Sequence, residues 1–126
     1  MELPNNLRWF LVQKSTTFVP WHLEEKPRGL NNVFKSEDIE QRELFVFAYR
    51  QDCDDLAGFL IVDGLITDKV IYFHPSYTSN PKAQRESGWS IVTGEYNDIF
   101  EFFAEVIVPD MREWALVDDA EEWRSE

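Results

Sequence analysis

The side chains best suited to chemistry stand together at residues 52–55, which read Asp-Cys-Asp-Asp between two apolar runs. Closely spaced carboxylates suggest a calcium loop, but that loop needs a further oxygen ligand, a glycine and a late glutamate. Leu56 and Ala57 occupy the next positions, so the template fails and we expect no metal site. Two interpretations remain. The carboxylates either accept hydrogen bonds within a solvated hairpin tip, or form an acidic protrusion that recognises a partner.

The other reactive side chains do not form a catalytic pattern. Cys53 has no histidine near it in sequence, and acidic neighbours raise the pKa of a thiol, which suppresses the nucleophilic thiolate. His22 and His74 lie in separate segments and match neither a Ser-His-Asp order nor a histidine-pair metal motif. We expect His74 to end a strand with a local hydrogen bond. The sequence therefore predicts a protein that is not an enzyme and uses no cofactor.

Charge limits the class of partner. The net charge of −12 argues against nucleic acid and against an anionic membrane surface, since both attract basic proteins. It permits a basic protein partner drawn in by long-range attraction, although acidity can also serve solubility alone. Residues 35–63 hold eight acidic against three basic groups, and residues 98–126 hold ten against two. If these two regions lie close together, one face of the molecule is strongly negative.

The acidic segment 52–55 must be held by the apolar runs around it. Runs of aromatic and β-branched residues at 44–49, 56–62 and 70–74 predict three strands of an antiparallel meander. Both side-chain sets of the first strand are apolar, which is typical of a central strand covered on both faces. The alternation predicts one face with Phe45, Phe47 and Tyr49, and the other with Leu44, Val46 and Ala48.

Two helices are expected to cover this sheet. The first spans residues 3–13, with a proline in its first turn and a short apolar stripe. The second runs from about residue 97 to residue 108, is capped by Asn97 or Asp98, and ends at Pro109. Its core-facing side chains follow the helical spacing i, i+3, i+4, i+7. These are Ile99, Phe102, Phe103 and Val106.

The remaining segments are predicted to be less regular. We expect loops at residues 22–42 and 74–88, the first with one helical turn near residues 36–39, and a short strand at residues 89–93. Trp9 and Trp114 fall in helical patterns and are expected in the core. Residues 118–126 are expected to form an acidic, frayed tail.

The length of 126 residues indicates one domain, residues 1–126, of the α+β class. We expect a mainly antiparallel sheet of about four to six strands packed by N-terminal and C-terminal helices. The single cysteine suits a reducing compartment, and no apolar run approaches the roughly 18 residues of a membrane span. Without a recognisable leader segment either, we expect a cytoplasmic protein.

The hairpin resembles that of a known family. Phe47, followed by the acidic segment 52–55, Leu56 and Ala57, is similar to the signature hairpin of the SUKH superfamily. The closest branch is the Smi–Knr-like branch, which also includes fungal cell-wall-synthesis regulators. Further matching features lie along most of the chain. They are the Leu3-Pro4 helix, Pro20-Trp21, Gly88-Trp89, and the segment from Ile99 to Phe103 that leads to Asp110 and Trp114.

This resemblance implies an α+β immunity protein that binds and neutralises a cognate toxin, often a nuclease, of a contact-dependent or polymorphic toxin system. The alternative is an intracellular scaffold or regulatory module without a toxin partner. In either case the acidic surface is expected to meet a basic protein, with no oligomeric state specified. The predicted partner-binding residues are Asp52, Asp54, Asp55, Glu95, Tyr96, Asp98, Glu101 and Glu105.

Overall fold

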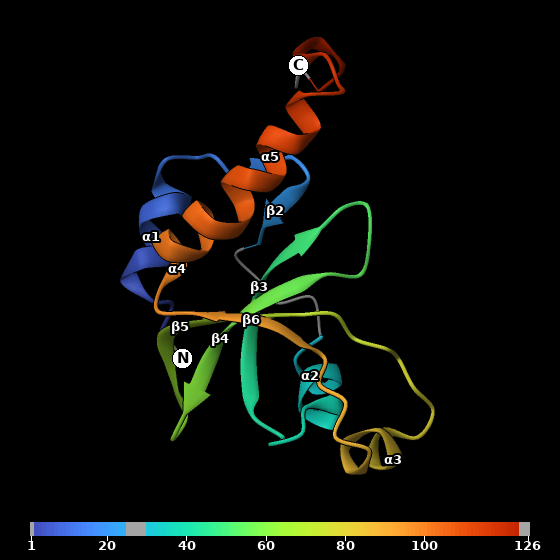
Figure 1. Ribbon diagram of the computed structural model, residues 1–126. Coiled ribbons are helices and arrows are strands. Elements are labelled where there is room, and N and C mark those ends of the chain that lie inside the picture. Colours follow the sequence, from blue (N-terminus) through green and yellow to red (C-terminus); the bar gives the residue numbers. More distant parts are fainter. Residues whose placement is uncertain (1, 25–29, 124–126) are drawn as a thin grey trace.

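The computed structural model describes residues 2–24 and 30–123, and its strands form one open sheet (Figure 1). Each strand pairs with the strand next to it in the sequence, and every pair is antiparallel. The structure confirms the predicted α+β fold and the antiparallel meander. The strands are β1 (Thr17–Phe18), β2 (Trp21–Leu23), β3 (Glu43–Arg50), β4 (Leu56–Val62), β5 (Leu65–Phe73) and β6 (Val92–Tyr96).

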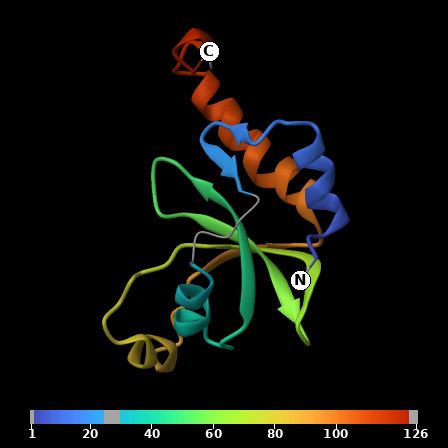
Figure 2. The same cartoon turned by 180° about the vertical axis from the view of Figure 1, so that it is seen from behind.

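Helices cover both faces of this sheet (Figures 1 and 2). The N-terminal helix and the C-terminal helical segment lie on one face, and a short helix between β2 and β3 lies on the other. The helical elements are α1 (Asn5–Val12), α2 (Asn31–Glu37), α3 (Pro81–Glu86), α4 (Ile99–Phe102), the π-helical η1 (Phe103–Ile107), α5 (Val108–Ala115) and the 3₁₀ turn η2 (Ala120–Trp123).

The central strands are buried on both faces, as their two apolar side-chain sets predict. On the face covered by α1 and α4, Leu7 and Phe102 pack in one cluster with Phe59 of β4. On the opposite face, Phe34 of α2 packs against Phe73 of β5, with ring centroids 4.7 Å apart. Burying one such side chain contributes about 1.5–3 kcal/mol. The two clusters therefore hold the helices to the sheet and position their outer surfaces.

A β-bulge in β3 changes which residues face which cluster. The pairing register with β4 shifts between Val46 and Ala48. Before the shift the predicted faces are right, since Phe45 and Phe47 lie on the α1–α4 face and Val46 on the α2 face. After it, Ala48 joins the cluster of Phe47, and Tyr49 packs against the α2 cluster. The predicted faces of Ala48 and Tyr49 are wrong because an extra residue inverts the alternation.

The β4–β5 hairpin is closed by two residues, because β5 begins five residues before the run at residues 70–74 that predicted it. Val62 pairs with Leu65, which leaves Asp63 and Gly64 in the turn. Their φ angles are +51° and +78°. Two successive positive φ angles are the requirement of a type I′ turn, whose twist matches that of the flanking strands. This turn sets the register of the hairpin.

The C-terminal helix does not end at Pro109. The elements α4, η1 and α5 follow one another without a break from residue 99 to residue 115. Proline lacks an N–H group, and its ring clashes with the carbonyl four residues earlier in an α-helix. A π turn widens the helix just before this point, and Pro109 falls in the first turn of α5. The predicted end is wrong, and the helix is longer by almost two turns.

The two predicted loops contain helices. Within residues 22–42 the structure has α2, which ends before Ile39, while residues 25–29 lie outside the described chain. Within residues 74–88 it has α3, which begins at Pro81 and is capped by Asn80, whose Oδ1 accepts the Ala83 N–H at 3.2 Å. The short strand expected at residues 89–93 lies three residues later, as β6.

A buried carboxylate ties the segment 74–88 to α2. Glu37 is only 2% exposed. Its Oε1 accepts the N–H and hydroxyl of Ser76, each at 2.8 Å, and the side-chain amide of Gln84 at 3.3 Å. Its Oε2 accepts the Tyr77 N–H at 3.0 Å. Because a buried carboxylate is tolerated only when it is hydrogen-bonded, these four donors hold the segment in place.

The chain ends in an arm that projects away from the sheet (Figures 1 and 2). After α5, the turn η2 spans Ala120–Trp123, within the part of the chain expected to fray, and residues 124–126 lie outside the description. Among the described residues, no helix has both the length and the apolar character that crossing a bilayer requires.

Candidate partner-binding surface

The β3–β4 hairpin presents its acidic tip to solvent. Asp52 and Asp54 are exposed, so the tip is not buried in the core. Asp52 is already paired, because the Nε of Arg50 donates to its Oδ1 at 2.8 Å. Asp54 is the one predicted tip residue for which the described structure has neither a hydrogen bond nor an ion pair. Arg50 therefore offsets one of the three negative charges at the tip.

Asp55 has a structural role. Its Oδ2 accepts the Tyr72 hydroxyl, and its Oδ1 lies 2.6 Å from His74 Nδ1. His74 does form a hydrogen bond at the end of a strand, as predicted, but the bond is not local, because Asp55 lies 19 residues earlier in the chain. Burial raises the pKa of Tyr72, and the hydrogen bond to Asp55 raises it further, so the phenol stays protonated and donates. With a side chain 16% exposed, Asp55 offers little surface to a partner.

The thiol of Cys53 is exposed at the same tip. Partial desolvation is the largest cause that raises its pKa, and the charges of Asp55 and Asp52 add to the effect, against a backbone hydrogen bond that lowers it. A thiol with a raised pKa is a poor nucleophile. The positive charge of Arg50 lowers the pKa of Cys53 but does not outweigh the effects that raise it.

Asp110 links the hairpin to α5. Its Oδ2 accepts the indole N–H of Trp21 at 2.8 Å and lies 3.4 Å from an Arg50 guanidinium nitrogen. Trp21 is completely buried. Arg50 in turn holds Asp52, so one chain of contacts runs from the helix to the tip. The base of the hairpin tip is thus linked to the C-terminal half of the helical segment through Arg50.

Four of the predicted binding residues gather at the other end of this segment, where β6 leads into α4. The Asp98 Oδ1 accepts the Glu101 N–H at 2.8 Å and so caps α4. The Glu101 Oε2 accepts the N–H of Asn97, the residue before the cap, at 3.3 Å. Burial raises the pKa of Tyr96, and the charges of Glu105 and Glu101 raise it further. The structure therefore brings Tyr96, Asp98, Glu101 and Glu105 together.

Glu95 lies apart from this group although it precedes Tyr96 in the chain. It pairs with Ile71 in the sheet, whose side chain belongs to the α2 face, whereas Tyr96 lies on the α4 face. Its carboxylate is 3.0 Å from Lys69 and 3.5 Å from Arg42. Two cations therefore offset the charge of Glu95.

The acidic row formed by Asp98, Glu101 and Glu105 has no such compensation. None of the ion pairs formed by the described residues involves Glu101 or Glu105. Between residues 98 and 123 the chain has nine acidic groups and one basic group. Residues 98–123 therefore carry an excess of eight negative charges, and five of their nine acidic groups lie between residues 98 and 115.

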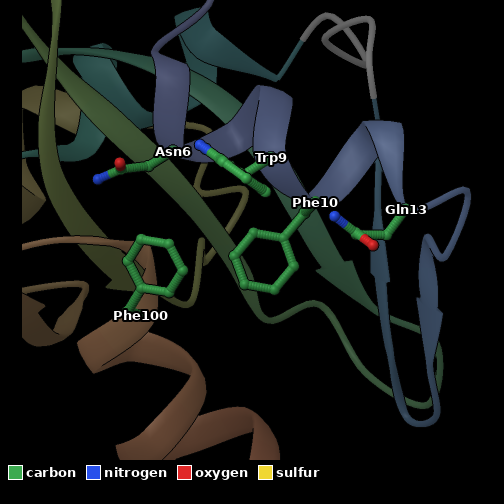
Figure 3. A pocket seen from close by; sticks show the side chains of 5 residues that line it. All are labelled: Asn6, Trp9, Phe10, Gln13 and Phe100. Carbon is green, nitrogen blue, oxygen red and sulfur yellow. The ribbon is translucent and has the colours of Figure 1, made fainter.

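An aromatic groove opens between α1 and α4, the helix that also carries Glu101 (Figure 3). It has a volume of about 320 Å³ and is lined by Asn6, Trp9, Phe10, Gln13 and Phe100. Trp9 is 58% exposed, so the prediction that it lies in the core is wrong. Phe100 is 49% exposed. In the sequence, Trp9 falls outside the apolar helical stripe of Leu7 and Phe10, and this position indicates that its side chain faces outward.

The described residues provide no cluster of three or more His, Cys, Asp or Glu side chains placed to hold a metal ion. Asp98, Glu101 and Glu105 instead lie along one helical segment, an arrangement that suits contact with a positively charged surface. Comparisons with protein-family models, with curated proteins and with solved structures gave no match to this chain.

Proposed function

We propose that this chain is an immunity-type binding protein, which neutralises a toxin by covering a basic surface of it with the acidic row of Asp98, Glu101 and Glu105. The observation that carries the proposal is that this acidic row lies on the same helical segment as the exposed Phe100, which lines the aromatic groove. Interfaces commonly combine aromatic anchors with complementary charge. The resemblance of the hairpin at residues 47–57 to that of SUKH proteins supports the immunity role.

The mechanism is binding alone. The acidic row attracts the basic partner over a distance comparable to the Debye length, and the aromatic side chains then supply contacts that exclude water. The complex would form in the cytoplasm, where an immunity protein meets a toxin that enters the cell. No catalytic step is assigned to this chain, and neither nucleic acid nor a membrane surface is its partner.

Co-expression with the toxin domain encoded next to its own gene tests this function. The expected result is that the two proteins copurify and that the chain restores growth of cells that make the toxin. Failure of both copurification and rescue would overturn the immunity role. A partner encoded elsewhere in the genome, bound without any effect on toxicity, would instead support a scaffold or regulatory role.

The electrostatic part of the mechanism has its own test. Between about 0.02 M and 0.5 M salt, the Debye length falls from roughly 20 Å to roughly 4 Å, so association should slow steeply. Replacing Glu101 and Glu105 with glutamine should slow association at low salt by roughly an order of magnitude. The control is the pair Asp63→Asn and Asp68→Asn, which removes the same charge from the exposed side of the β4–β5 hairpin. Equal effects of the two pairs would contradict the proposed surface.

A further inference from the structure

The groove between α1 and α4 has a rigid floor. The ring of Phe10 stacks on Phe103 with centroids 4.3 Å apart, and Phe18 meets the same Phe103 ring edge-on at 4.9 Å. Phe10 also lies 5.5 Å from the exposed Phe100. These contacts order the floor of the groove in the free protein. A site that is already ordered loses less conformational entropy on binding.

The two sides of the groove come from different elements. In Figure 3, Trp9 lies on α1 and Phe100 lies on α4, with the ring of Phe10 between the two helices. Val12 extends the apolar surface along α1 and is 67% exposed. Contiguous exposed apolar side chains in a charged protein mark an interaction site. With a volume of about 320 Å³, the groove has room for one or two large side chains.

The charge around the groove identifies the kind of occupant. Glu101 follows Phe100 directly in α4, and Glu105 lies one turn later on the same helical segment. On the α1 side, Arg8 lies 3.6 Å from the carboxylate of Glu2. No charged side chain of the described residues lines the groove itself, and the excess charge on the helical segment that forms one of its sides is negative. A second copy of this chain would bring the same acidic row against itself, which is unfavourable for a protein with a net charge of −12.

We infer that the groove receives a bulky apolar side chain from a basic segment of the partner protein, whose lysine or arginine residues meet Glu101 and Glu105. This inference rests on the proposed function and names the anchor within that surface. The side chain inserts between Trp9 and Phe100, and the neighbouring acidic row sets the orientation of the segment. Aromatic side chains at the centre of an interface commonly carry most of the binding energy.

Three synthetic peptides of equal length test the inference without the natural partner. The first repeats leucine and tryptophan at helical spacing with lysine elsewhere, the second is a scramble of the same residues without an apolar stripe, and the third has glutamate in place of lysine. The readout is the two-dimensional amide NMR spectrum of the whole chain, including the indole N–H of Trp9. The first peptide should bind and shift the Trp9 indole and the backbone around Phe100, and the other two should bind at least about tenfold more weakly.

Two variants with a matched control complete the test. Trp9→Ala and Phe100→Ala should each weaken binding of the first peptide about tenfold or more. Trp89→Ala should leave it unchanged, because Trp89 is similarly exposed, at 55%, but lies outside the groove. No binding of the first peptide, shifts centred on residues 52–55, or equal losses for Trp9→Ala and Trp89→Ala would each overturn the inference.

The toxin domain separates this inference from the proposed function. If Trp9→Ala and Phe100→Ala weaken toxin binding while Trp89→Ala does not, the anchor is supported. If these groove variants bind the toxin as tightly as the parent protein while Glu101→Gln with Glu105→Gln does not, the anchor is refuted and the immunity function stands.

Discussion

Replacing Asp110 with alanine should lower the free energy of unfolding by about 2–4 kcal/mol. The lost hydrogen bond joins a charged acceptor to the indole N–H of Trp21 at 2.8 Å, and Trp21 is completely buried, so the donor is left without a partner. Loss of such a bond costs about 1.5–3 kcal/mol. The longer contact to Arg50, at 3.4 Å and partly exposed, adds about 0.2–1 kcal/mol.

Urea unfolding followed by far-ultraviolet circular dichroism measures this effect. With an m-value of about 1.5 kcal/mol per molar urea, a loss of about 3 kcal/mol moves the midpoint down by about 2 M. Asp110→Asn keeps an oxygen toward the indole and should lose only about 1 kcal/mol. The control Asp54→Ala, at the exposed tip, should stay within about 0.5 kcal/mol of the parent protein.

Two outcomes would refute this reasoning. If Asp110→Ala unfolds at the same urea concentration as Asp54→Ala, the link between the hairpin and α5 contributes nothing to stability. If Asp110→Asn is as destabilising as Asp110→Ala, the negative charge carries the contribution and the hydrogen bond to the indole does not.

Two further predictions concern buried polar groups. Glu37→Gln should lower the free energy of unfolding by about 1–3 kcal/mol, because the new side-chain N–H group must face the N–H donors of Ser76 or Tyr77. Thermal unfolding measures this effect. Glu86→Gln, at an exposed position, is the control and should change stability little. The pKa of Tyr72 is raised above its ordinary value of 10.0, mainly by burial and then by Asp55, so above that pH the folded state holds a proton that the unfolded state has released. The free energy of unfolding should therefore fall as the pH rises above about 10. Urea unfolding between about pH 9 and pH 11 should show a smaller fall for Tyr72→Phe than for the parent protein. An unchanged pH dependence in Tyr72→Phe would contradict the raised pKa of Tyr72.

The strands were predictable because their signal is local and strong. The apolar runs at residues 44–49 and 56–62 correspond closely to β3 and β4. The faces of Ala48 and Tyr49 were not predictable from the alternation, since the bulge between Val46 and Ala48 depends on the pairing with β4. The continuation of the helix beyond Pro109 likewise depends on the π turn before it, and no residue type in the sequence predicts a π turn.

Parts of the candidate surface could have been predicted more closely. The spacing of Asp98 and Glu101 is that of a capping box, and the position of Trp9 outside the apolar stripe of α1 indicates an outward direction. The separation of Glu95 from Tyr96 follows from strand alternation once β6 is placed correctly. The role of Asp55 could not be predicted, because its partners Tyr72 and His74 come from another strand end.

The order of the strands has a consequence for how quickly the protein forms. Each strand pairs with its neighbour in the sequence, and the two-residue turn at Asp63-Gly64 brings β4 and β5 together with little loss of chain entropy. Native contacts that are close along the chain favour rapid folding, and a hairpin of this kind forms within about 1–10 μs. Rapid folding matters in the proposed role, because a newly synthesised immunity protein can bind the toxin only after it has folded. It must fold before the toxin reaches its target.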